Sequence, residues 1–120
     1  MLGTNDLLQE RQFTAEDTAQ RMEAFLQKIM AEPAVSDGKI TLRLIAPARM
    51  EYGAWVDEER LYLESRRLGE EYRKVAERMG TGFTDAGKWE IPVVYDGVHF
   101  SEEGHHIFAQ KIQEELAWLR

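Results

Sequence analysis

An aspartate and a histidine stand three positions apart near the end of the chain, in the stretch YDGVH. At this spacing the Asp96 carboxylate can fold back within one turn and accept a hydrogen bond from the His99 imidazole. That hydrogen bond would fix the tautomer and orientation of the ring, as a general base requires. The same residues are also typical of a plain turn followed by a histidine near a helix start, and the pattern alone leaves both interpretations open.

A second polar group follows directly on the first two residues, in the stretch MLGTNDL. Gly3, Asn5 and Asp6 form a pattern typical of a turn. If this turn lies at the edge of a sheet, the side-chain amide of Asn5 can donate a hydrogen bond to a developing oxyanion. The alternative is an asparagine that only shapes the turn or caps a helix. We expect Asp6 to organise the turn rather than to exchange protons.

The elements that must position these residues alternate between strands and helices. Apolar residues recurring every three or four positions predict helices, and short apolar runs rich in β-branched residues predict strands. We interpret Met1 and Leu2 as a strand end and GTND as the loop after it. The expected helices cover about 15–31, 57–79 and 102–119, and the expected strands lie within 40–47 and 82–85, the former inside a sheet. This alternation indicates an α/β fold with a parallel sheet, whose ligand sites gather at the carboxyl ends of the strands.

Capping residues mark the predicted helix ends. Thr14 followed by Asp17 is typical of an N-terminal cap, Ser101 is expected to cap the last helix, and Gly80 is expected just past the end of the middle one. Pro33 ends the first helix, before a turn at SDGK. The residues expected on the buried helix faces are Met22, Phe25, Leu26, Ile29 and Met30; Leu61, Leu68, Tyr72, Val75, Ala76 and Met79; and Phe108, Ile112, Leu116 and Leu119.

Composition excludes several function classes. The 120 residues fit one domain, and a net charge of −7 argues against a nucleic-acid-binding surface. The absence of cysteine excludes disulfides, a thiolate zinc site and a cysteine nucleophile. Neither a signal peptide nor a membrane-length apolar run is visible, so we expect a soluble, cytoplasmic protein with no membrane partner. His105 and His106 are adjacent on a predicted helix and cannot share a face, so no metal site is expected.

In order and spacing, MLGTNDL and YDGVHFSEEGHHIFAQKI resemble two conserved blocks of the SGNH hydrolases, also called GDSL esterases. Between them, ITLRLIAPARM is similar to the next core strand of that family, and FTDAG to the segment before the final block in its arylesterase-like branch. The resemblance spans essentially the whole chain. It implies a flavodoxin-like three-layer α/β/α sandwich, of which residues 1–120 are the C-terminal portion of a single domain.

The resemblance also implies a role for each matching residue. His99 would be the general base, Asp96 would orient it, and Asn5 would donate to the oxyanion. Gly3 would let the backbone turn closely at the site, with Asp6 in support. The implied reaction is the hydrolysis of a small acyl ester through a serine-bound acyl intermediate, without a metal or cofactor.

The family's nucleophile block, Gly-Asp-Ser-Leu or close to it, is absent from these 120 residues. Ser36, Ser65 and Ser101 do not sit on a strand-to-helix turn that would present a hydroxyl to a base, and Thr4 is next to the oxyanion donor. We therefore assign no nucleophile and expect the chain to be inactive by itself. A missing N-terminal segment or a second chain is expected to supply the serine.

Two other interpretations stay open. The chain could be a truncated, non-catalytic remnant or pseudoenzyme that folds as an oligomer, or a small-ligand binding module. So few strands would leave apolar surface exposed, and this makes a homo-oligomer an expected state. The aromatic loop 48–56 could line an acyl pocket with Met50, Tyr52 and Trp55, or simply pack. Trp89 and Trp118 are expected in the core or an interface.

Overall fold

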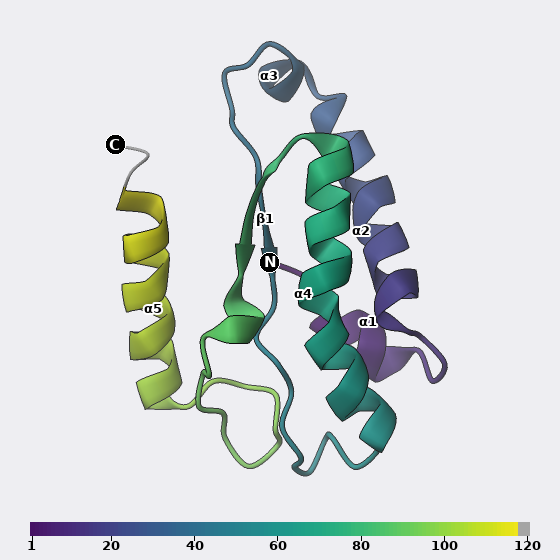
Figure 1. The fold of residues 1–120 in the computed structure, drawn as a ribbon, viewed down its shortest axis with the longest axis vertical. Coiled ribbons are helices and arrows are strands. Elements are labelled where there is room, and N and C mark those ends of the chain that lie inside the picture. Colours follow the sequence, from purple (N-terminus) through teal and green to yellow (C-terminus); the bar gives the residue numbers. More distant parts are fainter. Residues whose placement is uncertain (118–120) are drawn as a thin grey trace.

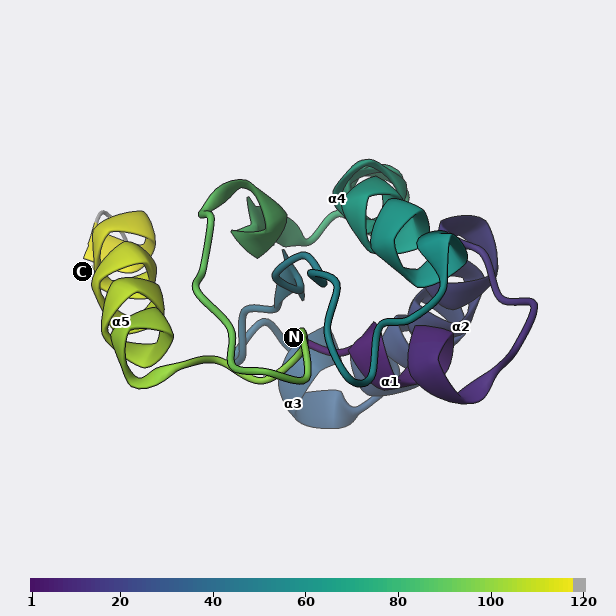
Figure 2. The same cartoon turned by 90° about the horizontal axis from the view of Figure 1, so that it is seen from below.

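A computed structural model of the chain describes residues 1–117 and shows five helices, a short 3-10 helix and two strands in that range. The helices lie on both sides of the two strands (Figures 1 and 2). In chain order the elements are α1 (Thr4–Gln9), α2 (Ala15–Met30), α3 (Pro33–Ser36), β1 (Arg43–Ala46), α4 (Glu59–Met79), β2 (Gly82–Asp85), η1 (Ala86–Lys88) and α5 (Glu102–Leu116).

The two strands are parallel, as the alternation of elements predicts. β1 and β2 pair in register from Arg43 opposite Gly82 to Ala46 opposite Asp85, and α4 connects them. Among residues 1–117 the sheet holds only these two strands, so the prediction that the strand within 40–47 is internal is wrong. The prediction of a strand end at Met1 and Leu2 is also wrong, because the described chain has no partner strand beside these residues.

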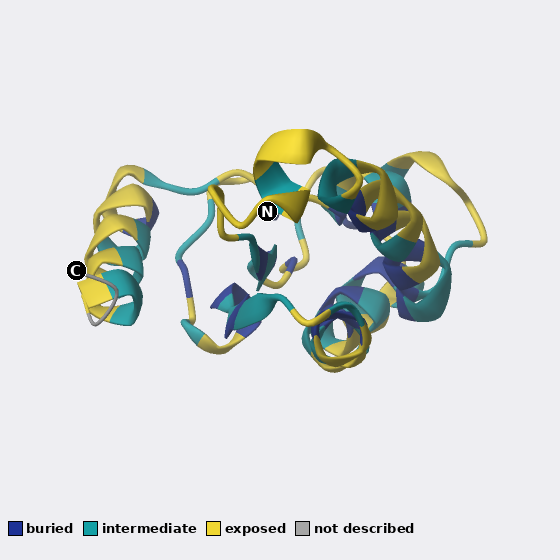
Figure 3. Cartoon of the chain, turned by 90° about the horizontal axis from the view of Figure 1, so that it is seen from above, coloured by how far each residue is buried: buried dark blue, intermediate teal, exposed yellow. Residues whose placement is uncertain are grey.

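The core lies between α2, α4 and the strands. Leu68, Tyr72 and Val75 on α4 are fully buried or nearly so, together with Met22 and Leu26 on α2. Figure 3 shows the dark blue, buried residues gathered in this region. Burying one such side chain contributes about 1.5–3 kcal/mol, so this helix pair provides a stable base for the loops beyond the strands. Phe25 departs from the predicted stripe, because 46% of it is exposed.

The predicted helix ends are confirmed. The side chains and backbones of Thr14 and Asp17 bond reciprocally at the start of α2, Ser101 caps α5, and Gly80 adopts a left-handed conformation after α4, with φ 72°. Pro33 follows the end of α2, but it also begins the short helix α3, which was not predicted and which ends at the first residue of the SDGK stretch. Proline is well suited to a first helical position, since its φ is already helical and its missing N–H is not needed there.

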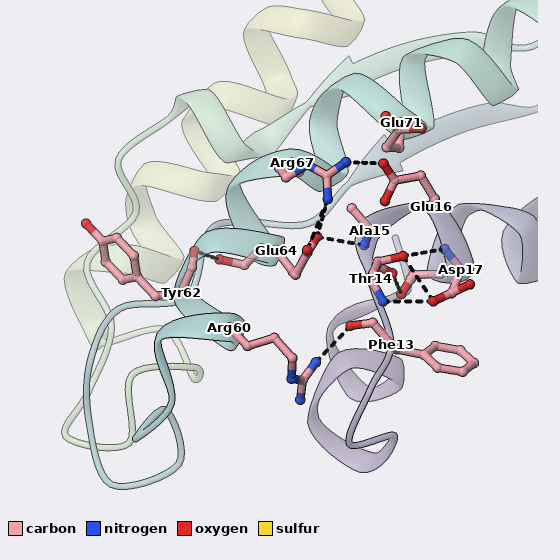
Figure 4. A network of polar contacts seen from close by, with 12 residues as sticks. Phe13, Thr14, Ala15, Glu16, Asp17, Arg60, Tyr62, Glu64, Arg67 and Glu71 are labelled. Carbon is pink, nitrogen blue, oxygen red and sulfur yellow. Dashed lines mark hydrogen bonds and ion pairs between the residues drawn. The ribbon is translucent and has the colours of Figure 1, made fainter.

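Polar contacts hold the start of α2 against α4 (Figure 4). The backbone N–H of Ala15 donates to Glu64 at 2.9 Å, and Arg67 bridges Glu64 and Glu16. Arg60 donates to the carbonyl oxygen of Phe13 at 2.8 Å, and it also donates to the carbonyl oxygen of Leu7 on α1. These bonds fix the N-terminal segment relative to α4, and with it the residues of MLGTNDL.

α1 replaces the loop predicted for GTND. Thr4 begins a six-residue helix after Gly3, whose φ of 130° turns the chain sharply. The Asp6 carboxylate lies in the first turn, where it suits the positive end of the helix dipole. Leu7 is buried completely against the core. This tertiary contact stabilises a helix that is too short to form by itself.

α5 lies across the strands from α2 and α4 (Figures 1 and 2). Phe108, Ile112 and Leu116 lie on the less exposed face of α5, as predicted, but the described residues do not cover this face fully. These side chains are only half-buried, and Gly104 is the one buried residue of the helix. Leu119 and Trp118 lie outside the described residues. Trp89 is half-buried against Phe108, at 5.5 Å between ring centroids.

No helix within the described range is long and apolar enough to cross a membrane.

Candidate active site

Asp96 and His99 form a hydrogen-bonded pair, as their spacing allows. The Nδ1 atom of His99 lies 2.5 Å from Oδ2 of Asp96. The other carboxylate oxygen accepts the backbone N–H groups of Val98 and His99, at 2.8 and 2.9 Å. These local bonds close the turn before α5 and set the position of the imidazole relative to the carboxylate.

The two partners differ in exposure. Asp96 is only 4% exposed, whereas 61% of the His99 side chain is open to solvent. Burial acts to raise the pKa of Asp96, but the N–H groups of Val98 and His99 and the imidazole together lower the pKa below its usual value. The carboxylate therefore stays ionised near neutral pH. It can hold a proton on Nδ1 and stabilise a positive charge on the ring.

The turn that carries the pair is docked against residues 51–56. The N–H groups of Glu51 and Trp55 donate to the carbonyl oxygens of Gly97 and Asp96, at 2.9 and 3.0 Å. Gly53 lies so close that an added Cβ would meet backbone atoms of residues 95–97 at 2.6 Å. Glycine at this position permits the close approach of the two segments, which sequence analysis treated as unrelated loops.

Gly97 makes the matching contact from the other side. Its φ is 82°, and a Cβ there would lie 2.1 Å from the carbonyl oxygen of Glu51. We expect Gly97→Ala to lower the free energy of unfolding by about 3 kcal/mol, because it adds a backbone clash to a strained left-handed conformation. Thermal or urea unfolding of the folded protein measures this loss. Gly38→Ala is the matched control, since Gly38 has φ 77° but nothing within 4 Å of an added Cβ. Equal losses in the two variants would show that the contact with Glu51 is unimportant.

A pocket of about 540 Å³ lies between the N-terminal segment and the residues around the start of α5. Gly3, Asn5 and Asp6 line it from the N-terminal side, and His99 and His105 line it from the start of the last helix. Asp96 does not line the pocket, and its carboxylate contacts the imidazole at Nδ1. The sequence placed these candidates at one edge of a sheet, and they do share one cavity, although Asn5 lies on α1 and not on a loop.

The side chain of Asn5 is exposed and forms no hydrogen bond with the described residues, so its amide is available to a ligand in the pocket. The Nε2 atom of His99 likewise has no hydrogen-bond partner within residues 1–117, because only Nδ1 is engaged. One donor and one free imidazole nitrogen therefore border the same cavity. An amide can stabilise a developing negative charge, and a free imidazole nitrogen can accept a proton.

Tyr72 supports the N-terminal wall of the pocket. It is fully buried, and its hydroxyl donates to the carbonyl oxygen of Leu2 at 2.7 Å. Burial, together with the nearby charge of Asp6, raises the pKa of Tyr72, so the phenol stays a donor. A Cβ at Gly3 would lie 2.2 Å from the tyrosine oxygen, and so Gly3 does allow the close turn expected of it. Sequence analysis placed Tyr72 only in the core, since helical periodicity does not show what a hydroxyl reaches.

None of the three serines contacts His99. Ser36 donates to the carbonyl oxygen of Pro33, and Ser65 is buried between α4 and the backbone of Met50. Ser101 caps α5 and also donates to the carbonyl oxygen of residue 92. Each of these hydroxyls therefore has a hydrogen-bond partner in the fold. The described residues also contain no group of three or more acidic or histidine side chains placed to hold a metal ion.

The residues of the aromatic loop 48–56 lie in different environments. Met50 is buried in the core, and Tyr52 stacks on Tyr62 at 4.5 Å between centroids. Trp55 lies beside His99, with ring centroids 5.0 Å apart and planes at 80°. Sequence analysis missed this last contact; the only signal for it was the glycine in YGAW, beside which the chain can approach the YDGVH turn.

Solved structures provide the comparison that decides the fold family, whereas no protein-family model and no curated protein matches. Est24, a carbohydrate acetylesterase from Sinorhizobium meliloti, is 22% identical with a TM-score of 0.82, and the match covers 100% of this chain and 59% of Est24. The native aryl esterase of M. smegmatis gives the same four values. A candidate arylesterase from Agrobacterium tumefaciens strain C58 is 25% identical with a TM-score of 0.78, covering 98% of this chain and 58% of its own.

In its fold, this chain is similar to these esterases, as the resemblance to the arylesterase-like branch of the SGNH hydrolases predicts. The resemblance seen in MLGTNDL and YDGVH is thereby confirmed. The chain spans 58–59% of the length of these three SGNH-type relatives. Their match supports an esterase-like fold of mixed helices and strands, in which residues 1–117 contain the two parallel strands β1 and β2.

Proposed function

We propose that this chain carries the acid–base and oxyanion elements of a serine ester hydrolase. The observation that supports it best is the short Asp96–His99 pair, with the opposite ring nitrogen free at a pocket that Asn5 also lines. The names of the SGNH-type relatives point to small esters of aryl alcohols or acetylated carbohydrates as substrates.

The proposed reaction begins when Nε2 of His99 accepts the proton of a serine hydroxyl. The serine oxygen attacks the ester carbonyl carbon, and the carbonyl oxygen becomes an oxyanion that accepts a hydrogen bond from the amide of Asn5. Asp96 stabilises the imidazolium, which then protonates the departing alcohol. Water, deprotonated by the same imidazole, then attacks the acyl carbon. The bond to the serine oxygen breaks, the imidazolium returns its proton to that oxygen, and the acid is released.

The nucleophile must come from outside these 120 residues. We propose that a further segment or a second chain supplies it and completes a flavodoxin-like α/β/α sandwich around β1 and β2. The half-buried face of α5 and the exposed Leu2 and Phe25 support this, because apolar side chains at a domain surface favour burial by a neighbour. A homo-oligomer could cover the same surface.

A fluorophosphonate probe followed by mass analysis, together with hydrolysis of p-nitrophenyl acetate, tests the proposal. The 120-residue chain alone is expected to show no labelled serine and no His99-dependent hydrolysis. Joined with the N-terminal part of an SGNH-type relative that carries the serine block, it is expected to become active. A joined protein that folds but stays inactive would leave the alternatives, a non-catalytic remnant or a ligand-binding module.

The role of Asn5 can be tested in the same joined protein. We expect Asn5→Ala to lower kcat by about 10²–10³-fold, since removing one oxyanion donor typically costs this much. KM should change little, because the bond strengthens only in the transition state. Gln9→Ala is the matched control, as it removes another amide from α1 that does not line the pocket. Wild-type kcat in Asn5→Ala would exclude the proposed oxyanion role.

A further inference from the structure

The imidazole of His99 is held firmly at one atom only. Asp96 engages Nδ1 at 2.5 Å, but 61% of the side chain is exposed. A single hydrogen bond at one end leaves the ring able to swing about that contact, and such a swing moves Nε2 away from any partner. A second contact on the ring is needed to restrict this motion.

Trp55 provides that contact. Its indole meets the imidazole in a T-shaped arrangement, with centroids 5.0 Å apart and planes at 80°. This is the distance and angle at which aromatic pairs attract each other. Within the described residues, Trp55 forms no other ring contact, and 51% of it is exposed, so core packing does not account for its position.

The backbone of Trp55 is fixed to the same turn that carries the catalytic pair. Its N–H donates to the carbonyl oxygen of Asp96 at 3.0 Å, and the N–H of Ala54 donates to that of Tyr95 at 3.0 Å. Gly53 and Gly97 allow the two segments to approach this closely. The backbone segments that carry the indole and the imidazole are therefore held together by hydrogen bonds, and this places the indole where it can limit rotation of the ring.

We propose that Trp55 is a positioning residue for the His99 imidazole: it holds Nε2 at the pocket by restricting rotation of the ring about its bond to Asp96. The catalytic consequence rests on the proposed function, but the restriction itself is a property of the folded chain. The two are tested separately below.

The first test is nuclear magnetic resonance of the imidazole signals in the folded 120-residue protein. Trp55→Ala is expected to remove the ring-current shift of the His99 ring protons and to increase their motion, whereas Trp55→Phe keeps part of both. Tyr52→Ala is the matched control, since Tyr52 is an equally exposed aromatic residue of the same loop that stacks on Tyr62 instead. The signals of His105 and His106 serve as internal references. Unchanged His99 signals in Trp55→Ala would overturn the proposal.

The second test uses the joined, serine-containing protein. There Trp55→Ala is expected to lower kcat by roughly tenfold to a hundredfold with little change in KM, since about 1 Å of misplacement costs about 10²-fold. Trp55→Phe should recover most of the loss. A change confined to KM would instead make Trp55 a substrate contact and contradict the proposal. If the joined protein is inactive with Trp55 present, the proposed function fails, and the resonance test still decides the positioning role.

Discussion

Replacing His99 by glutamine is expected to lower kcat of the joined, serine-containing protein by about 10⁶-fold. Loss of the general base in a serine hydrolase has an effect of this size, because the nucleophile is then no longer activated. Glutamine is close to histidine in size and can keep a hydrogen bond to Asp96, but it cannot accept and return a proton near neutral pH. Single-turnover hydrolysis of p-nitrophenyl acetate measures the chemical step, and circular dichroism verifies the fold.

His105→Gln is the control for this prediction. His105 lines the same pocket, but its ring meets that of Phe100 edge-on, with centroids 5.4 Å apart, and it has no carboxylate partner among residues 1–117. Its replacement should leave kcat within a few-fold of the original value. If His105→Gln were the damaging variant and His99→Gln were harmless, the base would have been assigned to the wrong histidine of the pocket.

Asp96→Asn is expected to lower kcat by about 10⁴-fold with little effect on folding. The amide oxygen of asparagine can still accept the N–H groups of Val98 and His99, so the turn should persist. Its NH₂ group, however, would donate to Nδ1 of His99. The ring would then carry its proton on Nε2, which is the wrong tautomer for a base that must accept a proton there.

Parallel measurements of kcat and of the unfolding midpoint separate the two effects in Asp96→Asn. The control is Asp85→Asn, in which a carboxylate that bonds the N–H of Gly87 at the end of β2 is changed in the same way. Asp85 does not contact His99, so kcat should hardly change. An Asp96→Asn protein that unfolds more easily and yet keeps its kcat would mean that Asp96 serves the turn alone.

The candidate site divides into a part that the sequence predicts and a part that it does not. Asp96 and His99 are three residues apart, and the bonds between them close within one turn. Thr14 with Asp17 and Gly80 are local in the same way, and the helix ends at these residues were predicted correctly. Short-range hydrogen bonds depend on the residue types within a few positions, so a pattern in the sequence is enough to find them.

The strands β1 and β2 were predicted with the right direction, because alternation with helices requires a parallel pair. How the other segments surround these two strands was not predicted. The sequence pattern could not show that β1 has one partner strand within the described residues, or that the apolar face of α5 is left half-exposed. How far an apolar face is buried depends on which other segments are available to cover it.

The sequence by itself indicated the candidate chemistry: a histidine that Asp96 can orient, the amide of Asn5, and no serine on a strand-to-helix turn. Only the tertiary structure decided their surroundings. It turned GTND into the helix α1, because Leu7 is buried and Gly3 fits against Tyr72. It set Trp55 beside His99 and brought Asn5 to the same pocket. These contacts join residues that are far apart in the chain. Their geometry depends on the packing of α2 against α4 and on the close approach at Gly53 and Gly97. A local sequence pattern does not encode such long-range contacts.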